Sequence, residues 1–137
     1  MDMYTGVLTD VVIAPGPIEI AWLTWACRDG RSEMEPRPLP DGAFFQQSRR
    51  TFLLRGYPAY FPEIREMNVL PIFEPAPPSM SMNWFLRAAV ALKNYNSEVR
   101  DWINWLDTVA ISGSVKWRYE ENDSWIVTAW RSKERIK

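Results

Sequence analysis

The sequence predicts a small α+β domain, and three observations carry this prediction. Its 137 residues are the length of one ordinary domain, and its 47% apolar content is that of a folded chain. Apolar residues recur at helical spacing in part of the chain, and β-branched runs occur near both ends. We therefore expect a single domain, residues 1–137, with an N-terminal strand, three to four helices, a C-terminal β-hairpin and a proline-rich extended arm over 57–80.

The N-terminal segment predicts a strand followed by a helix. Residues 3–13, MYTGVLTDVVI, are rich in β-branched and apolar side chains, and a Pro-Gly-Pro sequence ends them. Residues 18–30 fit two structures, because their first apolar residues also alternate as in a strand. Pro17 suits a first helical turn, Glu19 suits the positive end of the helix dipole and Gly30 suits the position after the last turn, so a helix is favoured.

The middle of the chain predicts a loop, a helix and the arm. Residues 31–40 form a loop, and residues near 42–55 form a helix with Asp41 as N-cap and Gly56 after its end. Residues 57–80 contain six prolines, each of which disfavours a helical conformation in the preceding residue. This arm is apolar, unlike a flexible Gly/Ser linker, so we expect it to lie against its own domain or against a partner.

Two helices are expected after the arm. Residues 82–95 predict the first, because Trp84, Ala88 and Leu92 recur every four residues. The second begins at Asn96 or Ser97 and gives the clearest periodic signal of the chain. Its apolar residues are Val99, Trp102, Ile103, Leu106 and Val109, and Gly113 is expected to end it.

Residues 114–132 predict a β-hairpin. With a turn centred on Asn122, one face carries three cross-strand pairs, namely Tyr119 with Trp125, Trp117 with Val127 and Val115 with Ala129. The other face carries Lys116, Arg118, Ile126, Thr128 and Trp130. This register is assumed, and a slip of one residue would exchange the faces.

Composition argues against several classes of function. A net charge of −1 argues against a chain-wide nucleic-acid or membrane-binding surface. The chain has no histidine and a single cysteine, so we expect no internal disulfide, no metal site, no cofactor and no catalytic residue. It begins with no signal-peptide pattern, which predicts a soluble protein of the cytoplasm or of a virion.

The favoured function is protein interaction or assembly. Eight tryptophans are more than we expect a domain of this size to bury, and large exposed aromatic patches usually mark partner sites. The partner is a second copy or another protein, and a viral or phage particle component or a small host-directed inhibitor fits this reading. The predicted partner-binding residues are Tyr57, Tyr60, Phe61, Ile72, Phe73, Trp22, Trp25, Trp105 and Trp130.

Two alternatives are kept. The first is a module that binds single-stranded nucleic acid by stacking and phosphate contacts. Its residues would be Lys116, Arg118, Trp130, Arg131, Lys133 and Arg135. The second is a carboxylate-based enzyme, which needs two acids converging on one cleft. Asp101 and Asp107 are six residues apart on the clearest helix and do not share a face, so their spacing does not favour this alternative.

Overall fold

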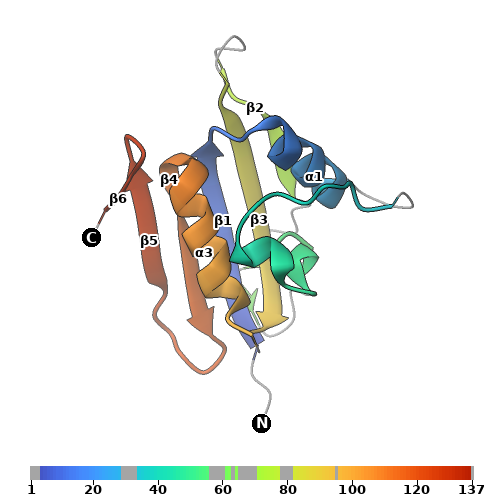
Figure 1. Ribbon diagram of the computed structural model, residues 1–137. Coiled ribbons are helices and arrows are strands. Elements are labelled where there is room, and N and C mark those ends of the chain that lie inside the picture. The colour runs from blue at the N-terminus through green and yellow to red at the C-terminus, as the bar shows by residue number, and fades with distance from the viewer. Residues whose placement is uncertain are drawn as a thin grey trace.

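The chain folds into one six-stranded antiparallel sheet with two α-helices and two short 3₁₀ helices on one of its faces (Figure 1). The computed structural model describes residues 4–28, 34–55, 61–62, 64, 71–77, 82–94 and 96–136, and these statements concern them. The elements in chain order are β1 (Tyr4–Ile13), α1 (Pro17–Cys27), η1 (Ala43–Gln46), η2 (Arg50–Leu53), β2 (Ile72–Pro75), β3 (Trp84–Lys93), α3 (Glu98–Val109), β4 (Ala110–Tyr119), β5 (Ile126–Arg131) and β6 (Glu134–Ile136). The α+β class is confirmed, whereas three to four α-helices are not, because the described residues contain two.

Strand β1 is central to the sheet, whose order is β2-β3-β1-β4-β5-β6. It pairs with β3 over ten residue positions, from Tyr4 opposite Lys93 to Ile13 opposite Trp84, and with β4 on its other edge. Helix α3 lies over the middle of the sheet, and β5 and β6 extend beyond it (Figure 1). The helical layer therefore leaves one margin of the sheet uncovered.

The two faces of the sheet are covered differently. Alternate residues of β1 from Thr5 to Ile13 point to the helices and are all buried, as the strand period of two requires. The opposite face forms a smaller core, in which Phe61, Ile64 and Ala91 pack with Leu8. The described residues of the predicted arm therefore lie against their own domain, and Ile72–Pro75 adds the edge strand β2.

The helix expected over residues 82–95 is wrong, because this segment is strand β3. Trp84, Ala88 and Leu92 are four residues apart, and a spacing of four also keeps side chains on one face of a strand. The strand is covered on both sides, by the main core at Leu86 and by the smaller core at Ala91, so its sequence shows little alternation.

The helix expected near residues 42–55 is replaced by η1 and η2. Polar tertiary contacts hold the break between them. Gln47 donates hydrogen bonds to the carbonyl of Asn96 at 2.7 Å and to the carboxylate of Asp101 at 2.8 Å. Arg49 pairs with the fully buried Glu98, with a distance of 3.0 Å between Nε and Oε2.

Helices α1 and α3 are confirmed, but the predicted end of α3 at Gly113 is wrong. Helix α3 ends at Val109, and β4 begins directly at Ala110. Gly113 lies inside β4 opposite Val11, with a φ of 99°. A Cβ atom there would lie 2.2 Å from the backbone oxygen of Asp10, so glycine permits the close approach of β1 and β4.

The C-terminal hairpin is confirmed with a register one residue away from the assumed one. Trp117 lies opposite Ile126, and Gly113 lies opposite Trp130. The slip places Trp130 on the helix-facing side with Val115 and Trp117, where Trp130 is 3% exposed. Burial of this indole determines the register, and β6 adds a strand that was not predicted.

An aromatic cluster joins α1, η1 and α3. Ring centroids lie 5.1 Å apart for Trp22 and Phe45, 5.2 Å for Phe45 and Trp105, and 5.3 Å for Trp105 and Trp102. Phe45 meets Trp22, Phe44 and Trp105 edge to face, which the ring quadrupoles favour. We call these rings, together with Phe44, the aromatic cluster.

Replacing Gly113 tests the close approach of β1 and β4. Gly113→Ala should lower the free energy of unfolding by at least about 3 kcal/mol, because the added methyl group meets backbone and φ is positive. Denaturant unfolding measures the change. Gly16→Ala is the control, since an added Cβ there meets only the end of the Glu19 side chain at 3.3 Å. Equal free energies of unfolding for the two variants would show that the close approach of β1 and β4 does not require glycine at position 113.

The carboxyl group of Glu35 should make stability depend on pH. Partial burial raises its pKa, but hydrogen bonds from Arg50 and Trp22 and the charges of Arg50 and Arg37 outweigh burial and lower the pKa below its usual value. A lowered folded-state pKa contributes stability above the unfolded-state value near 4.5, and this stability is lost as pH falls through the folded-state pKa.

Urea unfolding of Glu35→Gln measures this contribution. The variant should be less stable than the unmodified protein at pH 7, and the difference should shrink below about pH 4.5. Glu121→Gln, in the exposed β4–β5 turn, should show no such change. A Glu35→Gln deficit that is constant from pH 7 to pH 3 would contradict the assignment.

Candidate functional site

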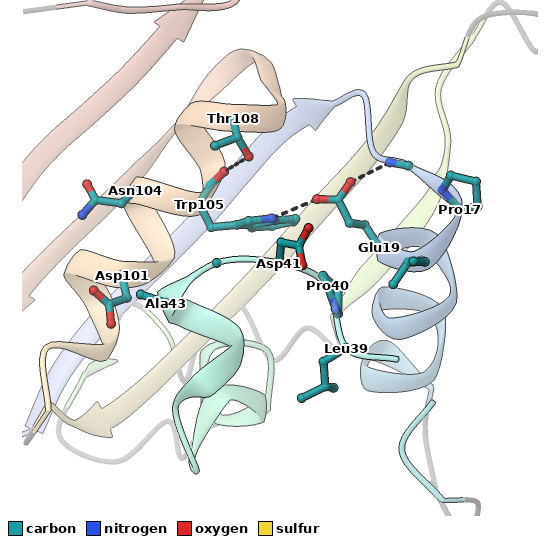
Figure 2. Close-up of a pocket in the computed structure, with 13 residues that line it drawn as sticks. Pro17, Glu19, Leu39, Pro40, Asp41, Ala43, Asp101, Asn104, Trp105 and Thr108 are labelled. Atoms are coloured by element: carbon teal, nitrogen blue, oxygen red, sulfur yellow. Dashed lines mark hydrogen bonds between the residues drawn. The ribbon is translucent and has the colours of Figure 1, made fainter. Parts of the chain in front are cut away.

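A hollow of about 590 Å³ opens between the start of α1, the loop that leads into η1, and α3 (Figure 2). Trp105 forms its floor, and Pro17, Ile18 and Leu39 supply apolar walls. Trp105 also belongs to the aromatic cluster, so the elements around the hollow are packed together. We call this site the acid-rimmed groove.

Three carboxylates from three elements surround the groove. Glu19 in α1 accepts a hydrogen bond from the backbone N–H of Gly16 at 2.7 Å and another from the indole of Trp105 at 3.0 Å. Asp101 in α3 accepts from Gln47, whereas Asp41 lies exposed before η1. None of the described lining residues is Lys or Arg, so the groove has a negative rim.

The arrangement suits an elongated group that is apolar along its length and positive at its end. Apolar walls gain from excluding water, and carboxylates favour an ammonium or guanidinium group. In the described part of the chain, no group of three His, Cys, Asp or Glu residues could hold a metal ion. Glu19 already accepts from two donors and Asp101 accepts from Gln47, which leaves the exposed Asp41 as the acid best placed to meet a ligand.

A second groove, of about 390 Å³, lies on the other side of α3. Its floor is formed by Trp117 and Tyr119 of β4 and Ile126 of β5, and Arg100 and Arg135 stand at its rim. No Asp or Glu is among its described lining residues. We call it the arginine-rimmed groove. Asn104 of α3 borders both grooves, so the helix separates a hollow lined by carboxylates from one lined by arginines.

The structure does not display the predicted aromatic partner-binding residues. All eight tryptophans are described, and each is buried or half-buried. Trp22, Trp105 and Trp130 are 0%, 4% and 3% exposed, and Phe61 is 0% exposed. Of these four, only Trp105 lines one of the two grooves described here.

The rest of the predicted partner set is divided. Trp25 and Ile72 are half-buried, and Phe73 stacks on Trp84 with 4.5 Å between ring centroids. Tyr57 and Tyr60 lie outside the described residues. The predicted set therefore forms no single surface, although Trp105 contributes the floor of a groove.

The residues predicted for nucleic-acid binding are separated by the sheet. Lys116, Arg118 and Arg131 alternate away from the helix side, whereas Trp130 and Arg135 lie on the helix side. Arg118 is 8% exposed and lies over the rings of Phe61 and Trp125. Lys133 is in the β5–β6 turn. These cations therefore do not form one continuous surface along which a nucleic-acid strand could bind.

Trp130 and Arg135 share one acceptor. The indole of Trp130 donates to Asp107 Oδ1 at 2.8 Å, and Arg135 Nε donates to the same oxygen at 2.9 Å. Asp101 and Asp107 therefore both serve as hydrogen-bond acceptors for neighbouring elements. They do not face one cleft, in agreement with their spacing in the sequence.

Sequence reasoning missed the residues that shape the grooves. Asp41 was predicted only as an N-cap, and the carboxylate of Glu19 only as a favourable charge in a first turn. Leu39 was expected only in a loop, and Tyr119 only in a cross-strand pair with Trp125. One signal was present: Asp41 is an acid next to an apolar segment, with no adjacent Lys or Arg.

In comparisons with known proteins, no family model, no curated protein and no solved structure matches this chain. Neither α-helix in the described part of the chain has the length and apolar character needed to cross a membrane.

The bond between Glu19 and Trp105 should couple α1 to α3. Glu19→Ala and Trp105→Phe should each reduce the free energy of unfolding, and the double variant should lose about 1 kcal/mol less than the sum of the two. Denaturant unfolding of the four proteins measures this coupling. As a control, the losses in the free energy of unfolding for Glu121→Ala and Trp105→Phe should add in the double variant. If the losses for Glu19→Ala and Trp105→Phe also add, the hydrogen bond between Glu19 and Trp105 contributes nothing to stability.

Proposed function

We propose that this protein is an interaction subunit that binds a basic, apolar segment of another protein in the acid-rimmed groove. The observation that carries the proposal is an apolar hollow whose described rim has three carboxylates and no cation. Protein partners are favoured over small cations because the hollow is open, and its walls extend from α1 to α3. Complementary charge would give such an encounter its specificity and much of its association rate.

The structural use of other acids supports a binding role over a carboxylate-based enzyme. Glu35 accepts hydrogen bonds from Trp22 and Arg50, and Glu98 accepts one from Arg49. Asp107 accepts hydrogen bonds from Trp130 and Arg135. Each of these carboxylates accepts donors that stabilise the fold. Only Asp41 among the rim acids is exposed, and one exposed acid does not make an acid–base pair.

Strand addition at a sheet edge is a less favourable route to a partner. Strand β6 spans three residues and carries Glu134 and Arg135, and β2 ends in Pro75. Short, charged or proline-containing edges are the features by which proteins avoid pairing with other strands. A groove on the helical side is therefore the better docking site.

Fluorescence polarisation with short labelled peptides tests the proposal. Peptides that combine Lys or Arg with Leu or Phe should bind saturably, and glutamine-substituted versions of the same peptides should bind more weakly. Asp41→Lys should weaken binding about tenfold, because it places like charges together. Asp123→Lys, in the exposed β4–β5 turn, is the matched charge control and should bind like the unmodified protein.

A second matched pair tests the apolar wall. Ile18 lines the groove and Ile136 lies on the far sheet margin, and each is 46% exposed. Ile18→Ser should weaken peptide binding, and Ile136→Ser should not. If basic peptides bind equally to all four variants, the groove is not the site. If no peptide in the set binds at low salt, the proposed function is wrong.

A further inference from the structure

The structure points to a second docking surface: we propose that the arginine-rimmed groove binds an acidic, apolar segment of a protein partner. This surface lies across α3 from the acid-rimmed groove and does not depend on its being occupied. Its occupant would carry the opposite charge. A domain with both surfaces would bring two segments of opposite charge together on either side of one helix.

The floor of this groove is apolar and open to solvent. Ile126, in β5, is 48% exposed, and Tyr119, at the end of β4, is 37% exposed. Behind them, Val99 and Ile103 of α3 are 2% and 7% exposed and form an aliphatic wall. Exposed apolar side chains that continue into a buried wall are typical of a docking surface.

The rim carries donors that can meet a carboxylate. The Arg100 side chain is 71% exposed, and its Nε lies 3.7 Å from Asp101. Arg135 is 40% exposed and gives two of its five N–H donors to Asp107. A guanidinium that is already positioned by one carboxylate can donate to a second carboxylate with little loss of side-chain freedom. Charge complementarity therefore selects an acidic partner.

A protein segment fits this groove better than single-stranded nucleic acid. Trp117 and Tyr119 meet edge to face, at 84° between ring planes, so they do not offer two parallel surfaces for stacking bases. The remaining floor and wall are aliphatic, at Ile126, Val99 and Ile103. Two arginines would contact few phosphates, whereas two are sufficient for the carboxylates of a short acidic segment.

Binding of labelled peptides that combine Glu or Asp with Leu or Phe tests the inference. Arg100→Glu and Ile126→Ser should each weaken binding about tenfold. Their matched controls lie on the opposite face of the sheet. Lys116→Glu reverses an exposed charge in the strand of Trp117, and Val127→Ser changes a residue that neighbours Ile126 and is 54% exposed. Both controls should bind as the unmodified protein does.

Three results would overturn the inference. One is the absence of saturable binding by every acidic peptide at low salt. Another is equal weakening by Ile126→Ser and Val127→Ser, which would place the peptide elsewhere. The third is binding of a single-stranded oligothymidylate that displaces the peptide and is lost in Arg100→Glu, since this would make the groove a nucleic-acid site. Asp41→Lys should leave acidic-peptide binding unweakened, which separates this test from that of the acid-rimmed groove.

Discussion

The fold depends on giving each buried indole N–H an acceptor. A buried donor without a partner costs about 1–3 kcal/mol, and this small domain encloses several. Trp22 donates to Glu35, Trp102 to Thr9 and Trp105 to Glu19, at 2.8, 3.1 and 3.0 Å. These bonds join the aromatic cluster to the sheet, to α1 and to the loop before η1. Because Trp105 is also the floor of the acid-rimmed groove, the packing that stabilises the fold also shapes the proposed binding site.

Local sequence signals predicted the elements whose signals are unambiguous. The strand over 3–13 is found as Tyr4–Ile13, in agreement with its β-branched and apolar composition, and the helix that begins near Ser97 is found because its apolar residues recur at helical spacing. Residues 82–95 failed for the opposite reason, since a spacing of four satisfies both a helix and a strand. Whether such a segment pairs with β1 is decided by tertiary contacts, which lie far away in the sequence. The hairpin register likewise depended on burying Trp130 against α3.

The candidate site was much less predictable. Counting tryptophans suggested an aromatic surface, but the count did not reveal that carboxylates and Thr9 would satisfy the indoles internally. Both grooves arise where elements distant in the sequence meet: Ile18 and Asp101 both line one, and Arg100 and Ile126 both line the other. No local pattern records such proximity. The acidic residues can be read from the sequence, but their position around one groove depends on how α1 and α3 pack.

Hydrogen exchange of the indole N–H groups tests most directly whether the aromatic cluster holds α1, η1 and α3 as one unit. Single Trp→Phe variants would assign the NMR signals. If the cluster is one unit, the indole protons of Trp22, Trp102 and Trp105 should exchange only through global unfolding, with opening free energies equal to the free energy of unfolding. Exchange of any of the three through a much smaller local opening would show that the walls of the acid-rimmed groove move independently, and would contradict the account.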